Sequence, residues 1–97
     1  MTVVETPQFV RQAEAVWTEA ERQEFVDFIA GNPEAGDVIP ETGGVRKVRW
    51  GRQGMGKRGG TRVIYFYHNQ ATPLFLLMVY AKAVREDVEP EAKKASA

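Results

Sequence analysis

The sequence predicts an α+β domain, in which two N-terminal helices pack on a small β-sheet. The sheet is expected to be antiparallel, except that a short first strand makes it a mixed sheet. The helix signals are confined to the first third of the chain, where two capping patterns each precede apolar residues at helical spacing. Three segments rich in β-branched and aromatic residues follow, and turn residues separate them. Helices and strands grouped in different parts of a chain are typical of α+β proteins.

The first helix is predicted to begin at Pro7, after a short strand at residues 3–5, and to end near Val16. Thr6 is a favourable N-cap because its side-chain oxygen accepts a hydrogen bond from the first turn, where Pro7 has no N–H to leave unsatisfied. The apolar side of this helix comprises Phe9, Ala13 and Val16.

The second helix is predicted from about residue 19 to residue 30. Thr18 and Glu21 have the spacing of a capping box, in which each side chain accepts a hydrogen bond from the backbone N–H of the other. Gly31 ends this helix, and Pro33 prevents its continuation. Its apolar stripe comprises Phe25, Val26, Phe28 and Ile29.

Three strands are predicted after a loop at residues 32–44. They span residues 45–50, 61–67 and 74–80. The last two are apolar on both sides, as expected for inner strands that are covered on both faces or largely buried. Because side chains alternate along a strand, a suitable register gathers four cationic residues on one face, and Tyr80 shares the face of the last of them. These four residues are Lys47, Arg49, Arg62 and Lys82.

Length and composition indicate one small domain over residues 1–97, with a flexible polar tail at about 89–97. The chain has no cysteine, which excludes disulfides and thiolate metal sites. Its single histidine, His68, falls in a predicted turn, so it is expected at the surface and argues against a zinc enzyme. The longest apolar run is too short to span a bilayer and no signal peptide is recognisable, so we expect a cytoplasmic protein without a membrane partner.

The net charge is zero, but the charges are unevenly distributed along the chain. Residues 1–41 contain nine acidic and two basic side chains, whereas residues 42–85 contain nine basic side chains and no acid. Because ordinary surfaces mix both signs, this distribution favours a binding face for a polyanion such as nucleic acid. The alternative is that the acidic and basic parts pair with each other within the fold.

The segment GRQGMGKRGG at residues 51–60 contains the pattern G-x-G-x-x-G and most of a P-loop. Arg58 stands where a P-loop has the Ser or Thr that holds magnesium. Both motifs also require a helix after the glycines, and here the next segment is a predicted strand. We therefore expect a connection between two strands, which is either a solvated linker or a basic loop beside a nucleic-acid site.

The chain resembles the RelE/ParE toxin superfamily in an ordered set of segments: GGVRKVRW, a glycine-rich loop with GKRGG, TRVIYFY, and LFLLMVYAK followed by an acidic pair. The stretch NPEAGDVIPETGGVRKVRW is typical of the HigB branch. This resemblance implies a type II toxin that inhibits translation as an mRNA interferase, an endoribonuclease that cuts mRNA in the 30S A site of the ribosome without a metal or cofactor. The implied partners are the ribosome, mRNA and a cognate helix-turn-helix antitoxin of the HigA type.

The resemblance also implies a catalytic surface of cationic residues on the sheet. The implied catalytic residues are Lys47, Arg49, Arg62 and Lys82. Arginine suits the phosphate because its planar fork binds two oxygens, so Arg62, assisted by Arg49, is expected to stabilise the charge that develops when the 2′-OH attacks. Proton transfer is the expected role of Lys47 and Lys82.

Further residues are expected to bind RNA or the ribosome through charge or by stacking on bases. They are Arg46, Arg52, Lys57, Arg58, Tyr65, Tyr80 and Arg85. For each tyrosine, a place in the hydrophobic core is an open alternative.

Two positions depart from the family pattern: Ala83 replaces an arginine and Val88 replaces a tyrosine, although Arg85 can substitute for the first. Two rival functions therefore stay open. One is a ParE-like toxin that poisons DNA gyrase without chemistry of its own, against which the many cations on the strands argue. The other is a binding module for RNA or antitoxin that has lost its activity.

Overall fold

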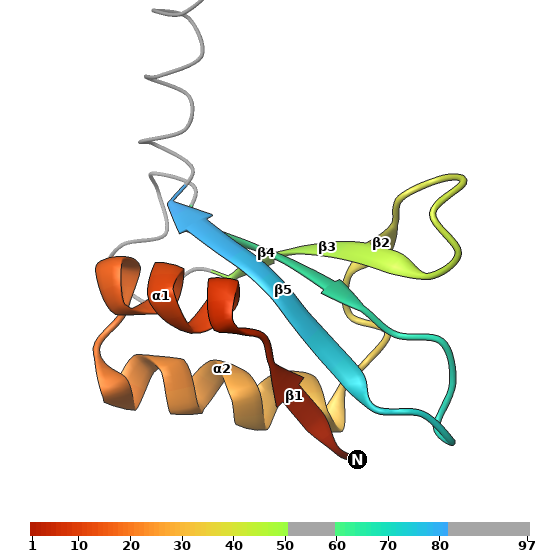
Figure 1. Ribbon diagram of the computed structural model, residues 1–97, viewed down its shortest axis with the longest axis horizontal. Helices are drawn as coiled ribbons and strands as arrows, with labels where there is room; N and C mark the ends of the chain where they lie inside the picture. Colours follow the sequence, from red (N-terminus) through yellow and green to blue (C-terminus); the bar gives the residue numbers. More distant parts are fainter. Residues whose placement is uncertain (51–59, 82–97) are drawn as a thin grey trace, which may run out of the picture.

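The computed structural model describes residues 1–50 and 60–81, and residues 51–59 and 82–97, including the expected tail, lie outside its description. The elements in chain order are β1 (Val3–Glu5), α1 (Pro7–Val16), α2 (Glu19–Gly31), β2 (Asp37–Val38), β3 (Val45–Trp50), β4 (Thr61–Phe66) and β5 (Leu74–Ala81). Both helices lie on the same side of the sheet (Figure 1). The predicted α+β class is confirmed, and every predicted helix or strand boundary agrees within one residue.

The five strands form one mixed sheet in the order β1-β5-β4-β3-β2. Strand β1 pairs parallel with β5, and the other neighbouring pairs are antiparallel. The edge strand β2 lies inside the segment predicted as a loop, so that part of the prediction is wrong. The physical reason is that β2 is only two residues long and both are exposed, so it has no apolar alternation to reveal it.

The helix starts have the capping interactions that the sequence indicates. The Thr18 hydroxyl accepts a hydrogen bond from the Glu21 N–H at 3.2 Å, and the Glu21 carboxylate accepts one from the Thr18 N–H at 2.8 Å. At the start of α1, the Thr6 hydroxyl accepts from the Phe9 N–H at 3.2 Å and donates to the Leu76 carbonyl of β5 at 2.8 Å. Thr6 therefore joins α1 to the sheet as well as capping it.

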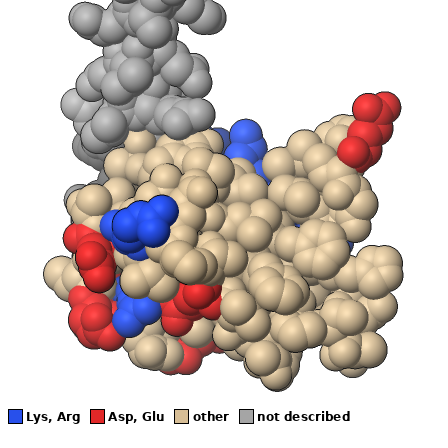
Figure 2. Space-filling model, viewed as in Figure 1, with Lys and Arg blue, Asp and Glu red and all other residues tan. Residues whose placement is uncertain are grey.

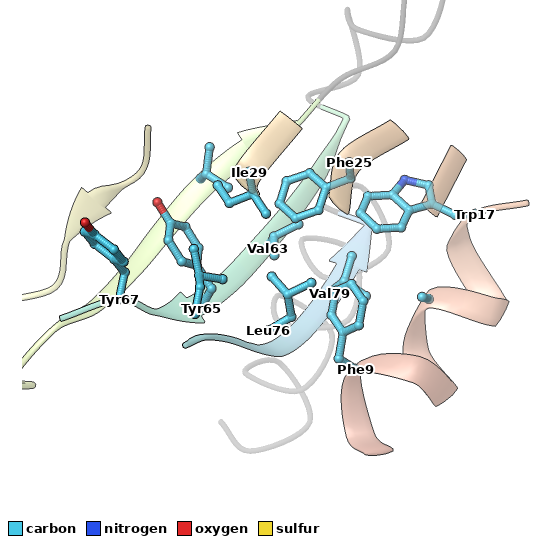
Figure 3. Close-up of a cluster of buried hydrophobic side chains, with 12 residues drawn as sticks. Phe9, Trp17, Phe25, Ile29, Val63, Tyr65, Tyr67, Leu76 and Val79 are labelled. Carbon is cyan, nitrogen blue, oxygen red and sulfur yellow. The ribbon is translucent and has the colours of Figure 1, made fainter. Parts of the chain in front are cut away.

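The hydrophobic core fills the space between the helices and one face of the sheet (Figure 3). Phe9 of α1 and Phe25 of α2 are fully buried, as are Val63 and Leu76 of the two central strands. Trp17 lies between the helices, with its ring centroid 5.4 Å from that of Phe25. These contacts hold both helices against β4 and β5.

The opposite face of the sheet, called the open face below, carries none of the described helices (Figure 1). The inner strands were expected to be covered on both faces or largely buried; within residues 1–50 and 60–81 the helices cover one face, and β4 is largely buried. The strand residues on the open face include Val45, Lys47, Arg49, Arg62, Ile64, Phe66, Phe75, Met78 and Tyr80. No helix in the described ranges is long and apolar enough to cross a membrane.

Candidate nucleic-acid interface

Strand pairing sets three residues of the open face side by side across the sheet. Arg49 of β3 lies directly opposite Arg62 of β4, and Arg62 lies directly opposite Tyr80 of β5. Directly opposite residues on one sheet face have Cβ atoms about 4.5–5.5 Å apart. We call Arg49, Arg62 and Tyr80 the cross-strand row. The row lies near the C-terminal ends of β3 and β5 and the N-terminal end of β4.

Lys47 extends the positive charge of this row along β3. It lies on the same face as Arg49, two residues away, and pairs with Ile64 of β4. The sequence-based prediction that Lys47, Arg49 and Arg62 share one face is confirmed, because the register of β3 with β4 brings them together. The fourth predicted member, Lys82, lies outside the described residues.

The members of this cluster differ in exposure. Lys47 and Arg49 are exposed, and within the described part neither forms a salt bridge. Arg62 is 9% exposed, so its guanidinium is held within the sheet surface rather than extended into solvent. Arg49 and Arg62 lie directly opposite each other, and one phosphate can accept hydrogen bonds from two guanidinium groups.

Asp37 is a residue of this face that the sequence analysis missed. It lies in β2 directly opposite Lys47. Because directly opposite residues of neighbouring strands share a sheet face, Asp37 also lies on the open face. Among the described strand residues on this face, Asp37 is the acidic one, and it lies at the sheet edge, one strand beyond the cross-strand row. Only a correct prediction of β2 would have revealed this neighbour.

Tyr65 was expected to contact RNA, and the structure contradicts that expectation. Its side chain is fully buried on the helix-covered face. The hydroxyl accepts a hydrogen bond from the Gly36 N–H at 2.9 Å and donates one to the Pro33 carbonyl at 2.8 Å. Burial raises the pKa of this phenol, and the Gly36 hydrogen bond only partly opposes the shift. Tyr65 is therefore a core residue that anchors the loop after α2.

Arg46 was also expected to bind RNA, but it lies on the helix-covered side of β3. It pairs across the strands with Tyr65, which places it on the face opposite Lys47. Its guanidinium donates to the Gly36 carbonyl at 2.8 Å and lies 6.0 Å from the centroid of the Tyr67 ring. Strand alternation separates Arg46 from Lys47 and Arg49, whose side chains lie on the other face, and a role for Arg46 in RNA binding stays a prediction. Its observed contacts hold the 33–36 loop.

The other predicted residues divide into two groups. Tyr80 is half-buried on the open face, and His68 is exposed after β4, as expected. Predicted binding residues outside the described ranges are Arg52, Lys57, Arg58 and Arg85, together with the variant positions Ala83 and Val88. The segment that carries the first three connects β3 to β4, whose ends pair as Trp50 with Thr61. The strand after the glycines, instead of a helix, removes the context that a nucleotide-binding motif requires.

A separate cavity of about 460 Å³ lies at the C-terminal end of α2. It is lined by Gly31, Asn32, Pro33, Glu34, Ala35, Tyr67 and Gln70. Tyr67 follows the end of β4 that is far from Arg62, so this cavity does not adjoin the cross-strand row. In the described part of the chain, no three His, Asp or Glu side chains are grouped as metal ligands would be.

A comparison against protein families shows which family the chain belongs to. A family model described as the RelE toxin of the RelE / RelB toxin-antitoxin system matches residues 2–97. This match covers both helices, all five strands and the segments outside the described ranges. The chain therefore belongs to the RelE toxin family, whose members are the toxins of RelE / RelB toxin–antitoxin systems.

Proposed function

We propose that this toxin is a ribosome-dependent endoribonuclease of the HigB-like branch, which cleaves translated mRNA in the 30S A site and so inhibits translation. The observation that carries the proposal is the cross-strand row with Lys47 beside it, on a sheet face that bears no described helix. Such a face can accept a single RNA strand, and its cations are spaced closely enough to contact one phosphate.

The proposed reaction needs no metal ion, because RNA contains its own nucleophile. The 2′-OH attacks the adjacent phosphorus, a P–O bond forms, and the bond to the 5′ oxygen of the next nucleotide breaks. Arg62 and Arg49 are proposed to hold the non-bridging oxygens and to stabilise the extra negative charge of the transition state. Lys47 and Lys82 are proposed to remove the 2′ proton and to protonate the leaving 5′ oxygen.

Several further residues are proposed to bind RNA rather than to act in the chemistry. Tyr80 can stack on a base or donate to phosphate beside Arg62. Four cations on the segments that adjoin the row are proposed to contact the rRNA or mRNA backbone: Arg52, Lys57, Arg58 and Arg85. Tyr65 has no part in this proposal because its side chain is fully buried, and Arg46 is left out because it lies on the other face of the sheet.

We further propose that the antitoxin is a helix-turn-helix protein of the HigA type and that the toxin acts in the cytoplasm. The departures at Ala83 and Val88 keep one rival alive, a toxin-like module that binds RNA or antitoxin without cleaving RNA. The other rival is a gyrase poison. That function does not explain why Lys47 and Arg49 are exposed beside Arg62.

Induced expression in bacteria, with transcriptome-wide mapping of mRNA 5′ ends, tests the proposal. The wild type should arrest growth and produce new cleavage sites in phase with codons. Arg62→Ala should abolish them, and Arg49→Ala should lower cleavage by about a hundredfold. Because Arg62 is buried, the exposed Arg49 provides the variant that leaves folding intact. Arg11→Ala, which removes an exposed arginine from α1, is the matched control and should behave as wild type.

The other outcomes separate the rivals. Growth arrest with intact mRNA and blocked DNA replication would replace the nuclease with gyrase inhibition. Soluble, folded wild-type protein that neither arrests growth nor cleaves mRNA would leave the inactive binding module.

A further inference from the structure

The open face continues beyond the cross-strand row into an apolar region that the proposed chemistry does not use. Phe66 of β4 pairs with Val45 of β3 and with Phe75 of β5. The rings of Phe66 and Phe75 have centroids 6.5 Å apart and planes inclined at 52°. Both are half-buried, and neither belongs to the hydrophobic core that the helices cover. We call Phe66 and Phe75 the aromatic pair.

The aromatic pair and the cross-strand row lie on one continuous strip. Arg62 and Phe66 are on the same face of β4, with Ile64 between them. The four residue steps from Arg62 to Phe66 span about 13 Å, which is on the order of two nucleotides of an extended RNA strand. The intermediate positions are Lys47, Ile64 and Met78, so no described strand residue between the aromatic pair and the row is acidic.

The backbone at Gly44 lies close to the edge of the Phe66 ring. A Cβ atom on Gly44 would come within 3.0 Å of the Phe66 Cε1 atom. Gly44 has φ of +133°, a conformation that favours glycine. A side chain at position 44 would therefore crowd the ring edge, and glycine leaves the edge of the aromatic pair clear on this side.

We propose that the aromatic pair is a base-stacking subsite for an unpaired mRNA nucleotide about two positions from the phosphate that Arg49 and Arg62 hold. This inference rests on the proposed function and adds a specificity element to it. Aromatic side chains stack on any base, and modest preferences arise from differences in stacking strength. Purines have the larger ring system, so the subsite favours adenine or guanine at that one position.

Charge favours RNA over a protein segment as the occupant of the strip. The apolar region adjoins Lys47, Arg49 and Arg62 without an intervening acid, and Asp37 lies at the edge beyond Lys47. A polyanion whose bases are apolar on their faces matches both halves of this surface, because its phosphates contact the cations while a base contacts the rings. A purely apolar partner would leave the cations unused.

The test uses ribosomes programmed with mRNAs that carry each of the four bases at every position near the A-site codon. Single-turnover cleavage is compared for the full-length wild type, Phe66→Leu/Phe75→Leu and Phe66→Tyr/Phe75→Tyr, with Ile64→Leu as the control on the same face. We expect the wild type to favour purines at one position about two nucleotides from the cut. The leucine double variant should lose that preference and cleave the favoured mRNA roughly fivefold to a hundredfold more slowly.

The tyrosine double variant keeps flat rings and should retain the preference, and Ile64→Leu should match the wild type. The fluorescence of 2-aminopurine at the favoured mRNA position should be quenched by the wild type and not by the leucine variant. An unchanged base profile in the leucine variant would overturn the inference, as would a uniform loss of rate at all bases, which indicates contact with rRNA or altered folding. Weakened antitoxin binding with normal cleavage would also overturn it and identify a protein-binding surface.

The proposed function can fail separately. If the wild type cleaves none of these ribosome-bound mRNAs, the nuclease proposal fails and the subsite fails with it. If the wild type cleaves them without any base preference at the predicted position, the subsite alone is overturned.

Discussion

Tyr65 shows how the environment of a single side chain decides its role. On composition it is one of several tyrosines near predicted cations, but its hydroxyl lies in the core and bridges Pro33 and Gly36 at 2.8 and 2.9 Å. A phenol that both donates and accepts at these distances is satisfied as a neutral group. Deprotonation would remove the hydrogen bond to the Pro33 carbonyl and leave a charge in an apolar site.

Tyr65→Phe tests this role through stability. At neutral pH the free energy of unfolding should fall by about 1–3 kcal/mol, because the buried Gly36 N–H and Pro33 carbonyl lose their partner. The pKa of Tyr65 is raised in the folded state, so its contribution is fully present below the unfolded pKa of about 10 and is lost as pH rises through the folded pKa.

Urea denaturation between pH 7 and pH 11 provides the measurement. Stability should decline less steeply above pH 10 in Tyr65→Phe than in the wild type, and toxin activity at pH 7 should be unchanged. Equal slopes in both proteins, or a loss of mRNA cleavage in folded Tyr65→Phe, would contradict the assignment of Tyr65 to the core.

At the scale of secondary structure elements, the two helix caps have similar sequences but different connections. Thr18 caps α2 at an exposed position, whereas Thr6 is part-buried and also bonds to the Leu76 carbonyl. Leu76 lies at an irregularity of the β4–β5 ladder, where Ile64 pairs with Met78 and Tyr65 with Leu76. The Thr6 hydroxyl therefore connects the junction of β1 and α1 to β5 at this irregularity.

We expect Thr6→Ala to destabilise the protein more than Thr18→Ala. Loss of the Thr18 cap should cost about 0.5–1 kcal/mol, and loss of Thr6 should cost about 1.5–3 kcal/mol because a cap and an inter-element hydrogen bond disappear together. Thermal or urea unfolding measures both, and Thr6→Ser, which keeps the hydroxyl, should stay close to the wild type. Equal costs for the two alanine variants would show that the bond from Thr6 to β5 contributes nothing.

At the scale of the whole molecule, the neutral net charge conceals two unlike surfaces. The helical layer bears exposed acidic residues such as Glu14, Glu24 and Asp27, and Figure 2 shows acidic side chains gathered around this side. The open face bears Lys47, Arg49 and Arg62. Within the helical side, Arg22 forms salt bridges with Glu5 and Glu19. An open face that binds a polyanion is what the proposed function requires of this separation.

The salt dependence of ribosome binding tests whether the open face contacts phosphates. The logarithm of the affinity for ribosomes should fall linearly with the logarithm of the salt concentration, and each phosphate contact removed should reduce the slope by about 0.7. Lys47→Ala/Arg49→Ala should therefore flatten the dependence, whereas Arg11→Ala should leave it unchanged. A slope that is equally reduced by Arg11→Ala would indicate diffuse attraction instead of binding through the open face.

The sequence by itself determined the fold class, both helices with their caps, the four longer strands and the common side of Lys47 and Arg49 on one strand, whereas the strand register placed Arg62 beside them. The features that the sequence determined depend on local chemistry and on the two-residue period of a strand, both of which are readable from neighbouring residues. The tertiary structure alone decided the pairing of Asp37 with Lys47, the burial of Tyr65, the internal contacts of Arg46 and the meeting of Phe66 with Phe75. Each of these depends on register and on which face the helices cover, and register is set by contacts between residues far apart in the chain.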